Sequence, residues 1–307
     1  MPFRISRLGY VEVKVLDLDD ALDFYTNVLG LRLVERLGNK AYLKTWDDQL
    51  AYSVILTESD TAGMVRAAFR TVDPEDVDYF ERKLKQYEVP YEVIPEDYKR
   101  GKALRFKTPS GHTFEIFNEI EIPGNYLPKE SPDPWPRDLK SDAINPPKID
   151  HTLITAPDPT KMIKFCEEVL EFRATEYIVN NEGQPIAAWL YQARQQPHDL
   201  AIVPGREAGM HHFAFHISSA QDIFRAADIM VMNDVKIDWG PGRHGITRGS
   251  GIYFFDPFGN RIETFGGYTA YLYDPGAKPI VWTEETMGKG IFYYERKLVE
   301  TFLTVYT

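Results

Sequence analysis

The sequence predicts an α+β protein of two homologous domains, each with a curved mixed β-sheet around a pocket. The segment LGYVEVKVLDLDDALDFYTNVLGLRL, which begins at Leu8, returns at Ile149 as IDHTLITAPDPTKMIKFCEEVLEFRA, at a constant offset of 141 residues. Within each half, the order of a strand, a helix and further strands occurs twice. Each half is therefore expected to hold two βαβββ modules, whose sheet curves around a pocket.

Two further repeats define the rest of each half. GMVRAAF from Gly63 returns as GMHHFAF from Gly209, and a helical pattern follows each copy. TPSGHTFEIF from Thr108 returns as DPFGNRIETF from Asp256. We therefore expect an N-terminal domain over residues 1–121 and a C-terminal domain over residues 148–267.

Two segments lie outside the repeats. Residues 122–147 are polar and rich in proline, which favours an extended linker. Residues 268–307 form a C-terminal tail. An amphipathic helix is expected over residues 285–302, packed on one of the domains or on a neighbouring subunit.

Composition excludes several classes of protein. The 307 residues include 35 basic and 46 acidic ones, a net charge of −11, and no basic run is long enough to neutralise several phosphates, so neither nucleic acid nor a membrane is an expected partner. No segment has the apolar length of a membrane span, and the N-terminus alternates like a strand, so a cytoplasmic protein is expected. The single cysteine, Cys166, excludes an internal disulfide and is expected to be a buried, inert thiol.

Histidine separates the two halves. Six of the seven histidines lie in the second half, and the first half holds only His112. Three repeat-equivalent positions carry the difference. The second half has His151, His212 and Glu263 where the first half has Tyr10, Arg66 and Glu115.

The second-half set fits a metal site. Two neutral imidazoles and one carboxylate, each from a separate predicted strand, suit a divalent ion of the iron type with open coordination positions. Taken alone, a strand histidine is more often a hydrogen-bonded structural residue, and Glu263 could be a carboxylate at the rim. The first half keeps the surrounding scaffold but replaces both imidazoles, and Arg66 would repel a cation there. This favours a duplicated fold in which one metal site has been lost.

Alternation along the strand GMHHFAFHI predicts which side chains share a face. Met210, His212, Ala214 and His216 are expected on one face, with His211, Phe213 and Phe215 on the other.

Three more polar residues are candidates for a reaction site. His198 starts a predicted strand and could act as a general acid or base, because imidazole titrates near neutral pH; it could equally be a structural histidine at a loop end. His244 and Tyr253 flank the glycine-rich turn HGITRGSGIY. Tyr253 could hydrogen-bond a bound oxygen atom, whereas a strand tyrosine in IYFF is ordinarily a core residue.

The run GRHGITRGSGIYFFDPFGNRIE, residues 242–263, resembles the signature of the type I extradiol ring-cleavage dioxygenases. These belong to the vicinal-oxygen-chelate superfamily, which has a glyoxalase-like fold. The similarity runs through the whole chain, including VWTEETMGKGIFYYERKL in the tail, and points to the catechol 2,3-dioxygenases (metapyrocatechases) within that family.

The resemblance implies roles for residues at matching positions. It implies that Fe(II) is held by His151, His212 and Glu263, with Mn(II) as the alternative ion. It also implies that His198 is the active-site acid or base, that His244 supports the ligands, and that Tyr253 hydrogen-bonds the diol. Side chains that line a hydrophobic substrate pocket are implied at Ile246, Ile252 and Phe302.

The implied reaction is extradiol (meta) cleavage of catechol or a substituted catechol by O₂ to a 2-hydroxymuconate semialdehyde, in a homotetramer. One alternative is a redox-free metal-dependent lyase or isomerase of the same superfamily. Such enzymes generally take ligands from both module pairs, which Tyr10 and Arg66 argue against. A second alternative is a non-catalytic binding module, which would need neither His198 nor a complete ligand set.

Overall fold

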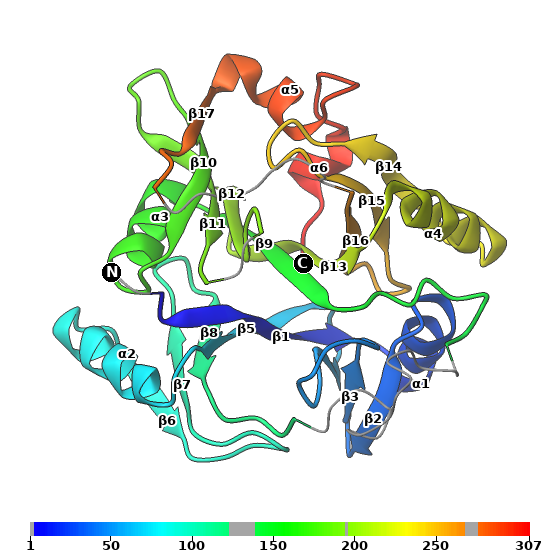
Figure 1. Cartoon of the computed structure of the whole chain (residues 1–307), viewed down its shortest axis with the longest axis horizontal. Helices are drawn as coiled ribbons and strands as arrows, with labels where there is room; N and C mark the ends of the chain where they lie inside the picture. Colours follow the sequence, from blue (N-terminus) through cyan, green and yellow to red (C-terminus); the bar gives the residue numbers. More distant parts are fainter. Residues whose placement is uncertain (1–2, 123–138, 194–195, 268–275) are drawn as a thin grey trace.

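A computed structural model describes residues 3–122, 139–193, 196–267 and 276–307. In it the chain forms two large mixed sheets (Figure 1). One sheet has eight strands in the order β2-β3-β4-β1-β5-β8-β7-β6. The other has nine, in the order β14-β15-β16-β13-β9-β12-β11-β10-β17. The predicted α+β fold with two homologous halves is confirmed, while residues 123–138 of the expected linker and 268–275 of the expected tail lie outside the described residues.

The strands of the first sheet are β1 (Ile5–Val15), β2 (Arg32–Leu37), β3 (Lys40–Lys44), β4 (Val54–Glu58), β5 (Gly63–Thr71), β6 (Tyr91–Ile94), β7 (Ala103–Lys107) and β8 (Thr113–Phe117). Those of the second are β9 (Ile149–Ala156), β10 (Arg173–Val179), β11 (Pro185–Tyr191), β12 (Leu200–Pro204), β13 (Gly209–Ile217), β14 (Ile237–Arg243), β15 (Ser250–Phe255), β16 (Arg261–Gly266) and β17 (Ile280–Thr283).

Each sheet is built from two βαβββ modules. In the first sheet β1 pairs with β4 in parallel, β5 pairs with β8 in parallel, and β1 joins the two modules by antiparallel pairing with β5. The second sheet repeats this with β9 and β12, β13 and β16, and the antiparallel pair β9 and β13. The first strands of all four modules are therefore central in their sheets.

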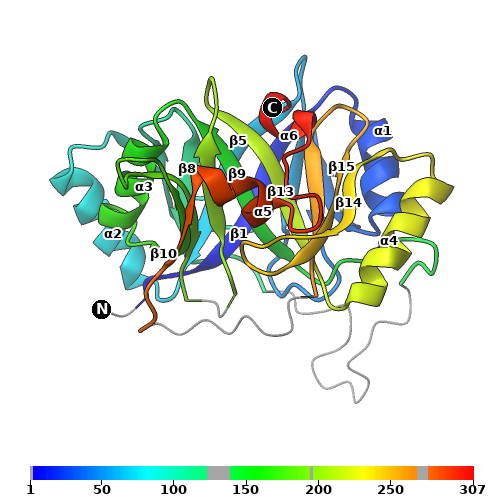
Figure 2. The same ribbon diagram turned by 90° about the horizontal axis from the view of Figure 1, so that it is seen from above.

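One helix follows the first strand of each module. The helices are α1 (Leu18–Asp23), continued by a π-helical turn over Phe24–Val28, α2 (Glu75–Gln86), α3 (Pro159–Glu168) and α4 (Ala220–Met232). They lie outside the sheets, α2 and α3 toward one side and α1 and α4 toward the other (Figure 2). Local sequence fixes the starts of α1, α3 and α4, because the side chains of Asp17, Asp158 and Ser219 accept hydrogen bonds from free backbone N–H groups of the first turn.

The apolar core lies between helices and sheets and continues across both halves. Cys166 of α3 is fully buried in it, and burial raises the pKa of its thiol, as expected for an inert cysteine. The concave face of each sheet holds a separate cluster. The first contains several tyrosines, among them Tyr10, Tyr42 and Tyr52, and the second contains Trp189, Trp239 and Tyr253.

The expected single helix over residues 285–302 is wrong. The tail instead contains β17, a 3₁₀ turn over Glu284–Thr286, α5 (Met287–Ile291) and α6 (Glu300–Thr304). Gly288 and Gly290 weaken a continuous helix, and Arg296 has a φ of 58°, which interrupts it.

The tail nevertheless packs on the C-terminal half. β17 pairs in parallel with β10 and extends the second sheet. Ile291, Phe292 and Phe302 join the aromatic cluster on its concave face. The tail therefore covers the pocket of the second sheet.

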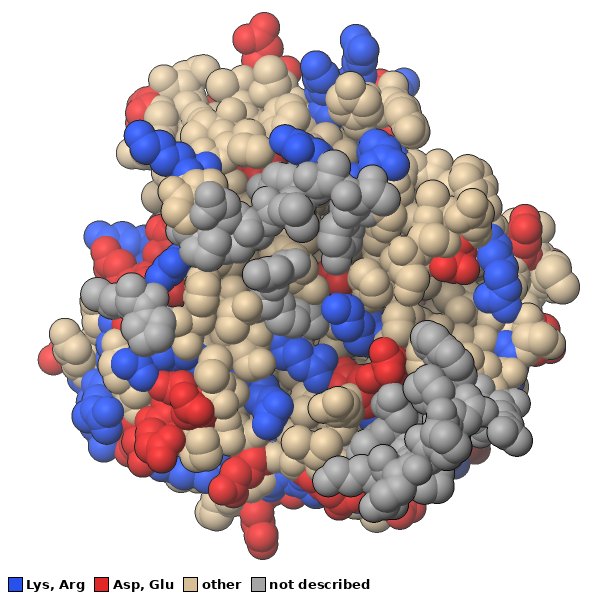
Figure 3. Space-filling model, viewed as in Figure 1, with Lys and Arg blue, Asp and Glu red and all other residues tan. Residues whose placement is uncertain are grey.

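No helix within the described ranges is long and apolar enough to cross a membrane. On the face shown in Figure 3, basic and acidic side chains are interspersed.

Candidate metal centre and active site

Three side chains from adjacent strands converge on the concave face of the second sheet. His151 lies on β9, His212 on β13 and Glu263 on β16, and these strands are neighbours. The Nε2 atoms of the two histidines are 3.2 Å apart, and Glu263 Oε2 lies 3.1 Å from His151 Nε2 and 3.2 Å from His212 Nε2. All three side chains are almost completely buried.

This spacing fits one divalent cation. Metal–ligand bonds of roughly 2.1–2.2 Å at right angles place neighbouring ligand atoms about 3.0–3.1 Å apart. Within the described part of the chain, His151, His212 and Glu263 are the one group of three or more His, Cys, Asp or Glu residues whose possible ligand atoms lie within 4.8 Å of one another. The donor set of two imidazoles and a carboxylate is the one expected for non-haem iron or manganese.

The charged groups around the three ligand atoms favour a bound cation. Burial by itself would raise the pKa of Glu263, but the contacts of its oxygens with His151, His212 and His244 hold that pKa well below its usual range. Burial by itself would lower the pKa of His151, but Asp150 and Glu263 raise it to about 9. The carboxylates therefore attract a cation to the place where the three ligand atoms meet.

A β-bulge aims His212 into the site. Met210 pairs with Ile154 and His212 pairs with Leu153, so His211 is an extra residue on β13. The prediction that Met210 shares a face with His212 and that His211 lies opposite is wrong. Met210 packs in the main core, whereas His211 contacts the rings of Tyr253 and Phe302 on the concave side.

Both histidine ligands have partners that sequence reasoning missed. His151 Nδ1 lies 2.8 Å from Asp150 Oδ1, and His212 Nδ1 lies 2.7 Å from His211 Nδ1. Each partner immediately precedes its ligand in the sequence. The polar residue next to each ligand in the sequence could have indicated these partners. Strict strand alternation, however, predicts that neighbouring side chains point to opposite faces.

A small cavity opens beside the three ligand atoms. It is lined by His151, Leu153, Trp189, His198, His212, His244, Ile246, Thr247, Tyr253, Glu263, Phe265, Ile291 and Phe302. The candidates His198, His244, Tyr253, Ile246 and Phe302 are thus all brought together around the triad. The apolar walls Leu153, Trp189, Phe265 and Ile291 were not singled out from the sequence, because each belongs to an ordinary apolar stretch.

Ile252 does not belong to this lining. It lies next to Tyr253 on β15, and successive strand residues point to opposite faces. Tyr253 faces the cavity, so Ile252 packs in the main core between sheet and helices. The sequence-based expectation that Ile252 lines the substrate pocket is therefore corrected.

His198 lies directly over one ligand. Its ring centroid is 3.9 Å from that of His151, and its Nδ1 is buried without a hydrogen-bond partner. Burial, together with the nearby His151, lowers the pKa of His198 well below the usual range. The imidazole is therefore neutral at physiological pH and can accept a proton.

His244 and Tyr253 complete the polar wall. His244 Nε2 lies 3.1 Å from Glu263 Oε1, and its Nδ1 lies 2.5 Å from the carbonyl oxygen of Ile291 in the tail. The rings of Tyr253 and His212 are 5.0 Å apart. Burial and the charge of Glu263 raise the pKa of Tyr253 well above its usual value, so this phenol stays protonated.

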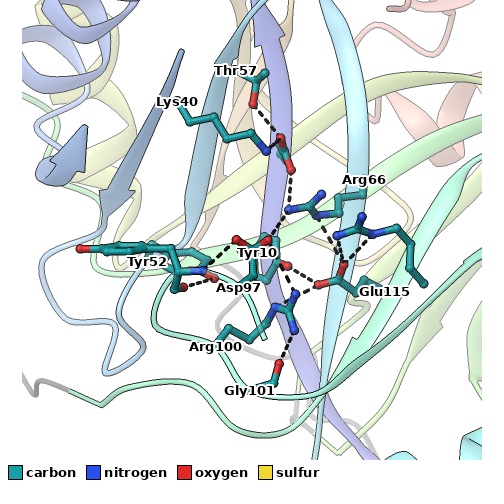
Figure 4. Close-up of polar contacts among 12 residues, drawn as sticks. Tyr10, Lys40, Tyr52, Thr57, Arg66, Asp97, Arg100, Gly101 and Glu115 are labelled. Carbon is teal, nitrogen blue, oxygen red and sulfur yellow. Dashed lines mark hydrogen bonds and ion pairs between the residues drawn. The ribbon is translucent and has the colours of Figure 1, made fainter. Parts of the chain in front are cut away.

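The equivalent place in the first sheet holds fixed charges. Tyr10 donates to Glu115 Oε1 at 2.5 Å, Arg66 lies 2.7 Å from Glu12 Oε2, and Arg105 lies 2.9 Å from Glu115 Oε2 (Figure 4). Arg100 also reaches Glu115, at 3.2 Å. Guanidinium groups thus neutralise the buried carboxylates that a cation would otherwise balance.

Comparisons with known proteins agree with this geometry. The profile of the Glyoxalase/Bleomycin resistance protein/Dioxygenase superfamily matches residues 7–116 and 148–264. The chain is 37% identical to a metapyrocatechase from Pseudomonas sp. (strain CF600), over 99% of each sequence. The chain belongs to the extradiol dioxygenase family of this superfamily.

Other dioxygenases resemble the chain in structure or in sequence. The 2,3-dioxygenase LapB from Pseudomonas sp. KL28 shares 36% identity with a TM-score of 0.86, covering 93% of this chain and 99% of its own. A manganese-dependent 2,3-dihydroxybiphenyl 1,2-dioxygenase from Geobacillus genomosp. 3 is 32% identical over 96% of this chain and 95% of its own length. These relatives give no support to the lyase or isomerase alternative.

Proposed function

We propose that this extradiol dioxygenase cleaves catechol or a substituted catechol with O₂ to a 2-hydroxymuconate semialdehyde, using Fe(II) held by His151, His212 and Glu263. The observation that carries the proposal is the convergence of three ligand atoms 3.1–3.2 Å apart beside an apolar cavity. Mn(II) suits the same donors, and one relative is named as manganese-dependent.

A bound redox-active ion supplies the electron transfer that triplet O₂ needs to react with a singlet diol, and three protein ligands leave positions for both reactants. The overall reaction adds one O₂ to one catechol. The ring bond between a hydroxylated carbon and its hydrogen-bearing neighbour breaks, and each of these carbons gains one oxygen atom. No net electron or proton is required from the protein.

His198 moves protons during this reaction. Its neutral imidazole lies against the ring of His151 and lines the cavity. It accepts a proton from a diol hydroxyl as the substrate binds and returns one as the ring opens, which is general acid–base catalysis.

Tyr253 and the apolar walls orient the diol. The protonated phenol of Tyr253 donates a hydrogen bond to a diol oxygen. Leu153, Trp189, Ile246 and Phe302 enclose the aromatic ring and keep bulk water from it. Placement of the ring beside the ligand atoms replaces a bimolecular encounter by a fixed geometry.

The test is to load the protein with Fe(II) under argon, add catechol, and then admit oxygen. A yellow ring-fission product should form only after oxygen is admitted. Formation of a different product at full rate under argon would instead indicate redox-free lyase or isomerase chemistry. Protein that holds one ferrous ion per chain but forms no product from catechols would contradict the proposed substrate class.

We further propose that the chain assembles as a homotetramer. The tail presents exposed apolar side chains at Val281, Tyr294 and Leu303, which a subunit interface would cover. Sedimentation equilibrium of the metal-loaded protein tests this, and a monomeric mass would contradict it.

A further inference from the structure

We propose that helix α6 of the tail sets the tautomer of the ligand His212 through His211, which makes His211 a positioning residue of the metal centre. The inference rests on the metal site of the proposed function. It concerns metal binding, so it can be tested without catechol or turnover.

The bulge on β13 places His211 between His212 and α6. His211 is completely buried, and its ring centroid lies 5.0 Å from that of His212 and 4.4 Å from that of Phe302. Its two nitrogens have different partners. Nε2 lies 3.0 Å from the backbone oxygen of Phe302, and Nδ1 lies 2.7 Å from His212 Nδ1.

These contacts allow one arrangement of protons for two neutral rings. A carbonyl oxygen only accepts, so His211 Nε2 carries the hydrogen and donates it to Phe302. His211 Nδ1 is then an acceptor, and His212 Nδ1–H donates to it. The remaining nitrogen of His212, Nε2, has a free lone pair and is the atom that points at His151 and Glu263. The carbonyl of Phe302 therefore selects the tautomer of His212 that can bind a metal.

The strand that carries Glu263 also anchors α6. Arg261 of β16 is buried and donates to the backbone oxygens of Thr301 at 2.9 Å and Val305 at 2.7 Å. Asp238 holds the same guanidinium at 3.1 Å. These bonds bracket Phe302, so its carbonyl is fixed relative to the sheet that bears the ligands.

The repeat supplies an internal comparison. In the first sheet Val65 stands where His211 stands, and Arg66 stands where His212 stands. The half that lacks the ligand imidazoles thus also lacks the imidazole that orients one of them. A role for His211 in packing alone would not require this joint loss.

The experiment compares His211→Leu with His211→Asn. Leucine fills space but offers no acceptor to His212, whereas the side-chain oxygen of asparagine can occupy the place of Nδ1. Metal affinity is measured by competition with a chelator, using Mn(II) and anaerobic Fe(II) with the full chain. Mutation of a residue that hydrogen-bonds a metal-ligating histidine typically weakens metal affinity by about 10- to 100-fold. We expect that loss for His211→Leu and affinity within about threefold of the unmodified chain for His211→Asn.

His112→Leu is the matched control. This buried imidazole also lies 3.1 Å from a carbonyl oxygen of β13, that of Gly209, but it has no contact with a ligand. The metal affinity of the His112→Leu protein should equal that of the unmodified chain. Two results would overturn the inference: a folded His211→Leu protein, judged by circular dichroism, that binds metal as tightly as the unmodified chain, or His211→Asn as weak as His211→Leu.

Discussion

His198 combines burial, neutrality and a nitrogen without a partner, a combination that a purely structural histidine rarely shows. Replacement by phenylalanine keeps a ring of similar shape but removes both nitrogens. We expect His198→Phe to retain metal and substrate affinity while kcat falls by roughly 10² to 10⁴-fold, the usual worth of general acid–base catalysis. Steady-state kinetics with metal analysis measure both; an unaltered kcat would remove the assigned role.

His212 should behave differently, because it is assigned as a ligand. Removing one of three protein donors leaves two that cannot hold a ferrous ion through gel filtration. We therefore expect His212→Ala to lose its metal, measured as ions per chain, while His112→Ala retains one ion per chain. Full occupancy of the His212→Ala protein would disprove the ligand assignment.

Among single residues, the three metal ligands could be predicted from the sequence because the two halves can be compared position by position. The sequence did not predict the roles of Asp150 and His211, which depend on which ring nitrogen faces which partner. Ile252 was assigned to the pocket by resemblance, but it neighbours Tyr253 on one strand, and only one of the two can face the cavity.

Among the elements, three separate segments meet at Glu176 of β10. Its carboxylate accepts hydrogen bonds from the backbone N–H of Thr247 at 2.5 Å and from Nε1 of Trp282 in β17 at 2.6 Å. Thr247 has a φ of 62°, in the loop that also carries His244 and Ile246. Glu176 therefore ties the cavity loop and the tail to the sheet.

This carboxylate makes stability depend on pH. Burial raises the pKa of Glu176 to about 7, although Trp282, Thr247 and Arg248 act to lower it. An unfolded glutamate has a pKa of about 4.5, so between these values the folded chain keeps a proton that the unfolded chain releases. The contribution of Glu176 to stability is thus lost as pH rises from about 4.5 to 7.

Glu176→Gln removes the titration. Relative to the unmodified chain, its unfolding free energy should improve by up to about 3 kcal/mol between pH 5 and pH 8, measured by urea denaturation. If the difference in unfolding free energy between Glu176→Gln and the unmodified chain did not change with pH, the raised pKa of Glu176 would be contradicted.

Sequence patterns predicted the modular elements better than the tail. Each βαβββ module has repeating strands and a helix, and a side chain caps the start of three of the four helices, whereas the tail has few local signals beyond Gly288 and Gly290. The β-bulge at His211 was also missed, because alternation assumes an unbroken strand and the bulge is defined by pairing with β9.

Over the whole molecule, the two halves share one fold but differ in the side chains on the concave faces of their sheets. The concave face of the second sheet holds the ligand triad, and that of the first holds Tyr10, Arg66 and Glu115 in a buried charge network (Figure 4). The first domain is therefore expected to support the second without binding a metal itself.

Arg66→Ala tests this division of roles. Arg66 is 5% exposed and lies 2.7 Å from the buried Glu12, so its loss removes one of the cations that neutralise the buried carboxylates of this network. We expect a loss of about 3 kcal/mol in unfolding free energy, with metal content still one ion per chain. Lys85→Ala, which breaks an exposed ion pair, should change neither. A second ion bound by the unmodified chain would contradict the metal-free assignment.

The central claim, that the buried triad supports insertion of both atoms of O₂ into a catechol ring, is tested most directly by isotope labelling. Fe(II)-loaded protein is given catechol under ¹⁸O₂, and the product is reduced at once with borohydride to prevent exchange of the aldehyde oxygen. Mass spectrometry should find one labelled atom in the carboxylate and one in the former aldehyde. A ring-opened product without ¹⁸O would contradict the account.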